Sequence, residues 1–454
     1  MSLDRLSAED VRILGLEAGN IRGHVCKVLI LGAGDVRPLP TLGELRAHID
    51  GCLDAAPRLR RRLVRSAFTA GSSLWVDDEE FDIARHVRAV EKPGPVGPER
   101  LREIVADLMA ERLDRAHPLW RIDVVEAMTD GSMALVWRIH HCLADGATMM
   151  RLAGQILWAG SSDVARVAAS AAWRPVPAPG GVALLARCTA AGLGPAARRA
   201  RSVGARARGL AQARRVGWDS KSAMKRELAR IARPTPLDHD AGPARRVAFA
   251  SAPFAACRAA AKAIDPAVTV NDFVLGAVAG GMRAWLAHRG LPSEGIRAKV
   301  PVSLHDPGGR DDAANRDSYF FVDLPVGEPD MAERLRAVNR QTVERKRLHD
   351  AEALYAATLR PSVARRAMSP EVFTLNVSNV PGPREDVYVL GARVCELYSV
   401  AEIAQHHALR VAVISAAGTL FFGLCADRDV ADDLEVVADG INASVLELVA
   451  PAAG

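Results

Sequence analysis

The chain alternates between segments with the apolar pattern of β-strands and segments with the periodicity of α-helices. The stretch 24–31, HVCKVLIL, predicts a buried strand, and residues 41–57 place apolar side chains at helical spacing. The same alternation runs from a predicted strand at 244–253 to a closing helix at 430–449. Strands that alternate with helices are typical of layered α/β domains. We therefore predict the α/β fold class.

The length and the linker composition predict two domains. At 454 residues the chain exceeds the size at which a single hydrophobic core keeps growing. The stretch WRPVPAPGG at 173–181 has the composition of a proline-rich linker. We expect a first domain at residues 1–165, a linker with helical content at 166–240, and a second domain at 241–454.

The linker region is the most basic part of the chain. Residues 181–235 hold thirteen Arg or Lys and two acidic residues, in a chain of net charge +5. The basic residues are interleaved with apolar ones, which suits a helix whose cationic face lies on an anionic lipid surface. A solvated connecting helix explains the same composition equally well. No signature of DNA or RNA binding accompanies the charge, so we expect no nucleic-acid partner.

The chain lacks sequence features of secretion or membrane insertion. Its seven cysteines are scattered without paired or metal-type spacing, as expected in a reducing cytosol. The first residues, MSLDRLSAED, are polar, and the longest apolar stretch, 411–426, is too short to span a bilayer. That stretch predicts a hairpin of two buried strands. We expect a cytoplasmic protein, with peripheral binding to the inner membrane face or to lipid droplets as an option.

Two adjacent histidines, His140 and His141, end an apolar run in WRIHHCLADGATMM at 137–150. Three interpretations compete: a metal site, two packed ring side chains, and a catalytic base. A metal site needs further ligands at fixed spacing. The other adjacent pair, His406–His407, has no Cys or carboxylate pattern beside it. We therefore expect no metal.

Asp145 and Gly146 favour the catalytic interpretation over packing alone. An acidic residue and a glycine so soon after the run place the histidines at a strand end and in a tight loop, where an imidazole can face a cavity. A neutral imidazole there can take the proton of a hydroxyl as its oxygen attacks an acyl carbon. Adjacent side chains of a strand face opposite sides, so only one of His140 and His141 can face that cavity.

The two histidines belong to a motif, HHCLADG, that resembles HHxxxDG of the acyl-CoA-dependent acyltransferase superfamily, which includes chloramphenicol acetyltransferase and the condensation domains of peptide synthetases. Six further blocks resemble, in the same order, those of the bacterial wax ester synthase/diacylglycerol acyltransferase family. They are RHVRAV (85–90), HPLWRIDVVE (117–126), PTPLD (234–238), TVNDFVLGAVAGGMRAWL (269–286), VPVSL (300–304) and SNVPGP (378–383). The resemblance covers nearly the whole chain.

This resemblance implies two chloramphenicol-acetyltransferase-like domains with the active-site tunnel at their interface. It implies that His141 is the general base and that His140 supports the loop from the other face. Asp145 would hold the loop through an ion pair, and Gly146 would keep the cavity floor clear for the substrate. The resemblance implies no metal and no cofactor, because acyl-CoA is itself the co-substrate.

Two polar pairs in the second domain are further candidates. Asn271 and Asp272 match the family's Asn-Asp pair at the start of a helix, where Asn is equally a helix N-cap. Ser378 and Asn379 in SNVPGP can donate to a developing oxyanion, and a rigid turn explains the same residues. Each pair therefore keeps a structural alternative.

Pro118, Leu119 and Trp120 begin a predicted strand of the first domain. Their large apolar side chains suit core packing or the wall of an acyl tunnel better than they suit chemistry. We count them as candidates for shaping the site.

Two segments depart from the family pattern. Ala314–Asn315 stands where the family has Gly-Asn, and residues 398–410, YSVAEIAQHHALR, lack the expected proline and glycine-rich segment. Both lie in the second domain, so they bear on the choice of acceptor. The rival interpretations are a condensation-type acyltransferase whose donor is attached to a carrier protein, and a catalytically silent lipid-binding paralogue.

The predicted reaction is acyl transfer from acyl-CoA to the hydroxyl of diacylglycerol or of a long-chain alcohol, which yields triacylglycerol or wax ester. His141 would deprotonate the hydroxyl, and polar donors at the domain interface would stabilise the tetrahedral intermediate. The basic linker fits an enzyme that meets its lipid at a membrane or droplet surface.

Overall fold

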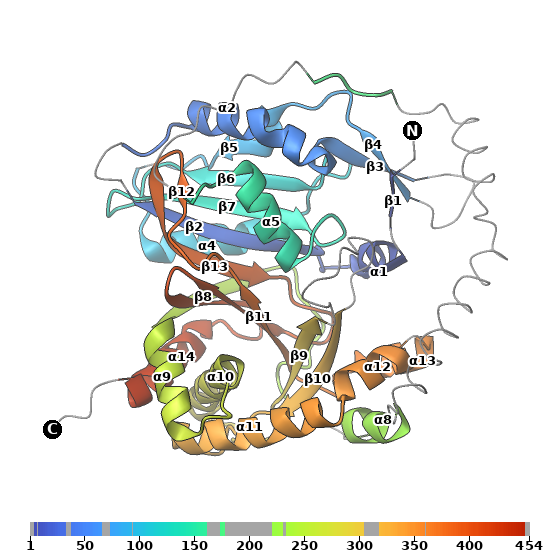
Figure 1. The fold of residues 1–454 in the computed structure, drawn as a ribbon, viewed down its shortest axis with the longest axis vertical. Helices are drawn as coiled ribbons and strands as arrows, with labels where there is room; N and C mark the ends of the chain where they lie inside the picture. The colour runs from blue at the N-terminus through green and yellow to red at the C-terminus, as the bar shows by residue number, and fades with distance from the viewer. Residues whose placement is uncertain are drawn as a thin grey trace.

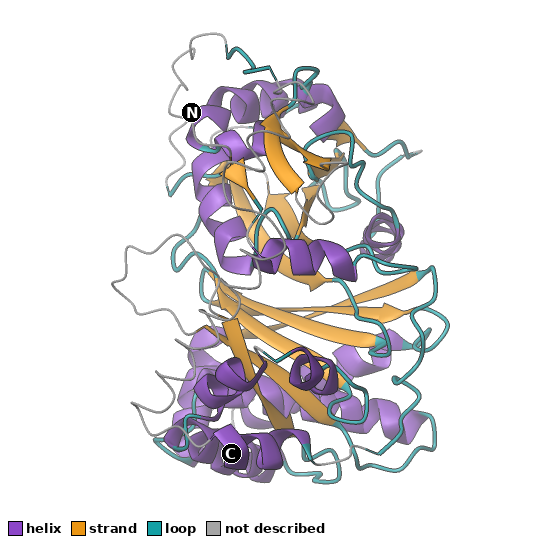
Figure 2. Ribbon diagram, turned by 90° about the vertical axis from the view of Figure 1, so that its right-hand side faces the viewer, coloured by secondary structure: helices purple, strands orange, loops and turns teal. Residues whose placement is uncertain are grey.

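The computed structural model describes residues 4–6, 8–32, 38–65, 73–92, 94–160, 173–177, 220–229, 233–303, 317–358 and 360–449. Two six-stranded sheets lie one above the other, and most helices lie on their outer sides (Figures 1 and 2). A small sheet beside the first large one has the order β1-β4-β3, with β1 (Asp4–Arg5), β3 (Arg61–Arg65) and β4 (Ser73–Asp77). The predicted α/β class is confirmed.

The first large sheet has the strand order β12-β13-β2-β7-β6-β5. Its N-terminal strands are β2 (His24–Gly32), β5 (Val87–Ala89), β6 (Trp120–Val125) and β7 (Met133–His140). β2 and β7 are buried along nearly their whole length, which explains why both are almost continuous apolar runs. The helices of this domain are α1 (Ala8–Leu16), α2 (Leu42–Cys52), α3 (Ile83–His86), α4 (Pro98–Ala110) and α5 (Gly146–Ile156).

The second large sheet has the strand order β10-β9-β11-β14-β15-β8. Its strands are β8 (Arg245–Pro253), β9 (Arg297–Ser303), β10 (Asp317–Asp323), β11 (Leu375–Pro381), β14 (Leu409–Ala416) and β15 (Thr419–Asp427). The outer face is covered by α9 (Phe254–Ile264), α10 (Val270–His288), α11 (Met331–Arg347) and α14 (Leu434–Val449) (Figure 1). Three more helices, α8 (Ser220–Leu228), α12 (Asp350–Thr358) and α13 (Pro361–Ala367), pack together near β10.

Two strands from the second half of the chain belong to the first sheet. They are β12 (Tyr388–Val389) and β13 (Ala392–Ala401), and β13 pairs antiparallel with β2 (Figure 1). Across this pair Lys27 Nζ donates to Ser399 Oγ at 2.7 Å. On its other side β13 packs against β15, where a Cβ on Gly423 would collide with the carbonyl of Ser399. The predicted boundary at residue 241 therefore does not divide the two sheets, because strand pairing between distant segments leaves no local pattern.

Several predicted elements can be compared directly with the structure. The hairpin predicted at 411–426 is confirmed as β14 and β15. The helix predicted at 41–57 is present as α2 but ends earlier, at Cys52. The α4 helix stops because Glu111, its C-cap, already has an extended backbone.

Two predictions fall largely outside the described residues. Of the basic segment 181–235, the structure describes 220–229 and 233–235, which include α8. The departure at Ala314–Asn315 also lies outside the described part of the chain. Within the described ranges, no helix is both long and apolar enough to cross a membrane.

Candidate active site

The segment 140–146 forms a tight turn between β7 and α5. The carbonyl of His140 accepts hydrogen bonds from two backbone N–H groups within the turn, at 2.8 and 3.3 Å. The Asp145 carboxylate accepts the N–H of Thr148 at 2.6 Å and so caps α5. The resemblance implies an ion pair for Asp145. Among the described residues the Asp145 carboxylate forms the helix cap and not an ion pair, because Asp145 directly precedes Gly146, the first residue of α5.

His140 is buried beneath the turn, with both ring nitrogens bonded. Its Nδ1 accepts the N–H of Cys142 at 3.1 Å, so the proton of the neutral ring is on Nε2. That Nε2 donates to Oε2 of Glu17 at 3.2 Å. The Glu17 carboxylate is also paired with Arg115 and with Arg112, at 3.4 Å from Nη1 of the latter. His140 therefore has no free lone pair with which to act as a base, and it supports the turn.

Glu17 and Gly23 fix the two histidines from below. Burial opposes ionisation of Glu17, yet the hydrogen bonds from His140 and Arg115 outweigh it and hold the pKa of the carboxyl below its usual value. Gly23 has a φ of 70°, and a Cβ there would lie 2.7 Å from Nε2 of His140. Its carbonyl accepts the N–H of His141 at 2.9 Å. A glycine is therefore required at this position.

His141 lies in the turn, and its side chain is partly exposed. Its Nδ1 is buried and has no hydrogen-bond partner among the described residues. Burial lowers the pKa of the ring, and the positive charge of Arg410 lowers it further, against smaller opposite effects of its own carbonyl and of Asp145. The imidazole is therefore neutral at pH 7 and able to accept a proton.

Strand β11 of the second domain lies against this turn. A Cβ on Gly146 would lie 3.3 Å from Cγ2 of Val380, so the glycine permits a close contact between the domains where the resemblance implies an open cavity floor. Side chains of β11 alternate, and those of Leu375 and Val377 lie in the helix-covered core. Ser378 therefore shares the opposite face with Val380. The residue is partly exposed, and its hydroxyl forms no hydrogen bond with another described residue.

Asn379 faces the other side of the sheet. It is in register with Val413 of β14, whose side chain lies in the helix-covered core. Because neighbouring residues of a strand point to opposite faces, Ser378 and Asn379 cannot both face His141. Ser378 is therefore the one of the two predicted oxyanion donors that shares a face with the turn, and its role stays a prediction.

Comparisons with known proteins match most of the chain. The family model described as the wax ester synthase/diacylglycerol acyltransferase (WS/DGAT) catalytic domain matches residues 6–274, and that of the WS/DGAT C-terminal domain matches residues 313–448. The chain belongs to the WS/DGAT family. It is an acyltransferase of that family, as predicted from the blocks of sequence.

Individual WS/DGAT relatives match over nearly their whole length. A protein of Mycobacterium tuberculosis named as a probable diacylglycerol O-acyltransferase is 30% identical over 452 residues, which cover 96% of this chain and 94% of the relative. The solved WS/DGAT of Marinobacter aquaeolei VT8 has a TM-score of 0.68 at 23% identity and covers 98% of both chains. The starter condensation domain of rhizomide synthetase, solved with C8-CoA and Leu-SNAC, has a TM-score of 0.53 at 14% identity, covering 99% and 95%.

In this WS/DGAT chain the Asn-Asp pair lies on the outer side of the second domain. Thr269 is the N-cap of α10, and Asp272 completes a capping box with it. The Asp272 carboxylate also accepts from Asn339 Nδ2 at 3.0 Å and from Thr342 Oγ1 at 2.7 Å. Asp272 therefore joins α10 to α11. The alternative in which Asn271 is the cap is wrong, because the helix begins one residue before it.

Pro118, Leu119 and Trp120 lie in the core of the first domain, and all three are buried. Trp120 Nε1 donates to the carbonyl of Leu59 at 2.7 Å. Its ring stacks on His86, with 4.6 Å between ring centroids. These contacts favour the packing alternative over a tunnel wall.

The second histidine pair has a structural role. His407 is buried and stacked on Phe373 at 3.9 Å between ring centroids, and each of its ring nitrogens faces a backbone carbonyl. His406 is exposed and paired with Asp240. Among the residues that the structure describes, no group of three or more His, Cys, Asp or Glu side chains is placed to hold a metal ion.

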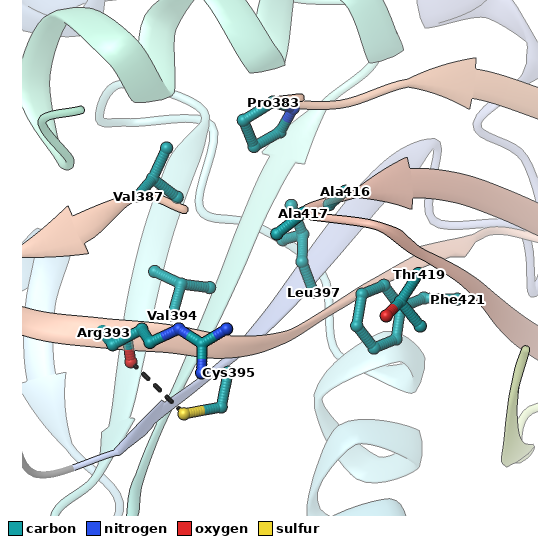
Figure 3. Close-up of a pocket in the computed structure, with 10 residues that line it drawn as sticks. All are labelled: Pro383, Val387, Arg393, Val394, Cys395, Leu397, Ala416, Ala417, Thr419 and Phe421. Atoms are coloured by element: carbon teal, nitrogen blue, oxygen red, sulfur yellow. Dashed lines mark hydrogen bonds between the residues drawn. The ribbon is translucent and has the colours of Figure 1, made fainter. Parts of the chain in front are cut away.

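A small pocket opens between the tip of the β14–β15 hairpin, β13 and the loop after β11 (Figure 3). Its wall includes Leu397 and Phe421, and Arg393 and Thr419 are polar groups in its lining. The pocket residue Ala416 lies six positions after Arg410 on β14, about 20 Å along an extended strand. The lining of this pocket includes neither His141 nor Arg410, and the tunnel implied by the resemblance stays a prediction.

Three residues at the site belong to no motif: Glu17, Gly23 and Arg410. Glu17 meets His140 across 123 positions of sequence, so only the fold brings them together. Arg410 does have a local signal, because it is the one charged residue in LRVAVISA, the sequence of β14. A charged side chain in an otherwise apolar strand marks a position with a special environment.

Proposed function

We propose that this enzyme transfers the acyl group of acyl-CoA to the hydroxyl of diacylglycerol or of a long-chain alcohol, with His141 as the general base. One observation carries the proposal: a neutral, partly exposed imidazole lies in the HHxxxDG turn at the contact between the two domains. The Nδ1 of this ring is buried, so Nε2 is the nitrogen that a substrate hydroxyl would approach.

The geometry supports a direct transfer in which each group has one task. His141 takes the proton of the alcohol while the oxygen attacks the thioester carbon. The Ser378 hydroxyl, on the face of β11 that meets the turn, donates to the oxygen that becomes negative. As the intermediate collapses, the thiolate of CoA leaves and takes the proton back from His141. The ester and free CoA are the products.

The choice of substrates follows from the relatives. The mycobacterial relative is named for diacylglycerol acylation, so diacylglycerol is the first acceptor to test. A structural neighbour was solved with C8-CoA, which makes a free acyl-CoA the first donor to test. The basic segment 181–235 supports contact with an anionic lipid surface, and it accords with a cytoplasmic enzyme bound peripherally to membrane or droplets.

The test is an assay with radiolabelled palmitoyl-CoA against diacylglycerol, monoacylglycerol and hexadecanol, with products separated by thin-layer chromatography. We expect labelled triacylglycerol or wax ester. Turnover only with a palmitoylated carrier protein would show that the donor is an acylated carrier protein and not acyl-CoA. Absence of product with every donor and acceptor would instead indicate a silent lipid-binding paralogue.

A further inference from the structure

Arg410 lies on the face of β14 that points toward the first domain. Along this strand Val411 and Val413 lie in the helix-covered core, whereas Ala412 and Ile414 lie in the core shared with the first domain. Since strand side chains alternate, Arg410 shares the face of Ala412. The arginine is partly exposed there, as His141 is.

The guanidinium of Arg410 has few partners. Its one hydrogen bond to a described residue runs from Nη1 to the carbonyl of Glu402, at 3.1 Å. Its Nε is buried and has no partner in the described ranges. The carboxylate of Glu402 is engaged elsewhere: Oε1 with Arg245 Nε at 2.8 Å, and Oε2 with the N–H of Arg22 at 3.3 Å. A guanidinium has five N–H donors, so most of those on Arg410 are left for another acceptor.

Short hydrogen-bonded steps connect Arg410 to His141. The N–H of His141 is bonded to the carbonyl of Gly23, and the preceding residue, Arg22, is bonded through its N–H to Glu402. The backbone carbonyl of Glu402 in turn accepts from Nη1 of Arg410. In the sheet Arg410 is in register with Asn376, two positions before Ser378 on the face of β11 that meets the turn, which agrees with the electrostatic effect of Arg410 on the His141 ring.

A poorly paired cation beside a catalytic base favours an anion as its ligand. The proposed acceptors are neutral, so two anions remain: the phosphates of CoA and the oxygen of the tetrahedral intermediate. The pantetheine arm holds the phosphates far from the thioester. The intermediate, by contrast, forms at the atom next to the hydroxyl that His141 deprotonates.

We propose that the Arg410 guanidinium binds the negatively charged oxygen of the tetrahedral intermediate. This inference rests on the proposed function. The alcohol oxygen bonds to the thioester carbon and gives its proton to His141, and the carbonyl π electrons move onto the oxygen that faces Arg410. When that oxygen re-forms the carbonyl, the carbon–sulfur bond breaks and the CoA sulfur receives the proton. Arg410 and Ser378 act on the same oxygen.

The experiment compares Arg410→Met and Arg410→Lys with the control Arg246→Met. Arg246 lies in the same sheet, on β8, and pairs with Glu435 of α14 on the outer side. Each enzyme is assayed with palmitoyl-CoA and with palmitoyl-pantetheine, which has no phosphates. Both kcat and KM are measured across pH 5 to 9, and folding is followed by thermal unfolding.

We expect Arg410→Met to lower kcat by roughly a hundredfold with both donors, with little change in KM, the loss typical for one donor to an oxyanion. Arg410→Lys keeps the charge and should recover part of the loss. The acid limb of the pH profile should move to higher pH in Arg410→Met, because the charge that lowers the pKa of His141 is gone. Arg246→Met should match the wild type.

A rise in KM for palmitoyl-CoA alone would overturn the inference in favour of a phosphate contact. Wild-type kcat in both Arg410 variants would also overturn it. If Arg410→Met does not fold, Arg410→Lys decides, since a purely structural role predicts unchanged kcat in a variant that unfolds at the wild-type temperature. Absence of turnover in the wild type with every alcohol would defeat the proposed function itself, and this inference with it.

Discussion

Nε2 of His140 lies 3.2 Å from Oε2 of Glu17, a carboxylate from the end of the first helical segment. This contact fixes the ring of the first histidine, because its other nitrogen already accepts the N–H of Cys142. The turn that carries His141 is thereby held from beneath by a charged group that is almost completely buried. The support that His140 gives to the turn is thus separate from the chemistry that we propose for His141.

Replacing Glu17 by Gln should lower both stability and turnover. Because the pKa of Glu17 is lowered in the folded state, the unfolded chain binds more protons in acid, and the stabilisation is lost as pH falls from about 5 through the folded pKa. We expect Glu17→Gln to lose about 2 kcal/mol at pH 7, the value of a hydrogen bond to a charged group, and to show a flatter acid limb. Urea unfolding from pH 3 to 7 measures this.

The matched control for that measurement is Glu103→Gln. Glu103 forms an exposed pair with Arg100 on α4, and such surface pairs contribute little. Equal losses in the two variants would show that the Glu17 contact has no special importance for the turn.

The variants Ser378→Ala and Asn379→Ala should differ in kcat, although the two residues are adjacent in the sequence. Ser378 shares the face of Val380, which meets the turn at Gly146, whereas Asn379 points into the other side of the sheet. We expect kcat to fall by roughly a hundredfold in Ser378→Ala and to stay near the wild-type value in Asn379→Ala. Equal activity in the two variants would remove Ser378 from the mechanism.

Lys27 should make a contribution to the free energy of unfolding that increases with pH above 8. Burial lowers the pKa of its ammonium group to about 8, so the unfolded chain binds more protons between pH 8 and 10.5. The contribution of Lys27 to the free energy of unfolding should therefore increase with pH in that window, by up to about 3 kcal/mol. It is measured as the wild-type value minus that of Lys27→Met, which removes the effect of the buried thiols common to both. Urea unfolding of both proteins at pH 7, 8, 9 and 10 checks this, and identical pH dependence would contradict it.

Much of the fold follows from the sequence because its main strands carry strong local patterns. β2 and β7 are long apolar runs, and the hairpin of β14 and β15 has a small-residue turn between two such runs. The placement of β13 does not follow, since its pattern says that it is a strand and nothing about its partner. Pairing with β2 is decided by contacts across more than 360 positions of sequence, as between Lys27 and Ser399.

The site shows the same division between local and distant information. The alternation of side chains separates His140 from His141, and it equally implies that Ser378 and Asn379 face opposite sides. The cap formed by Asp145 is a local feature of an aspartate before a helix. Glu17 and Arg410 could not be assigned from sequence, because each acts on a histidine that only the folded chain brings near.

The most direct test of the account is the turnover of His141→Ala with palmitoyl-CoA and the preferred alcohol. The control is His288→Ala, an exposed histidine at the end of α10. We expect His141→Ala to unfold at the wild-type temperature and to lose at least about a hundredfold in kcat, as for removal of a general base. Wild-type turnover in His141→Ala would contradict the assignment of the base and with it the proposed mechanism.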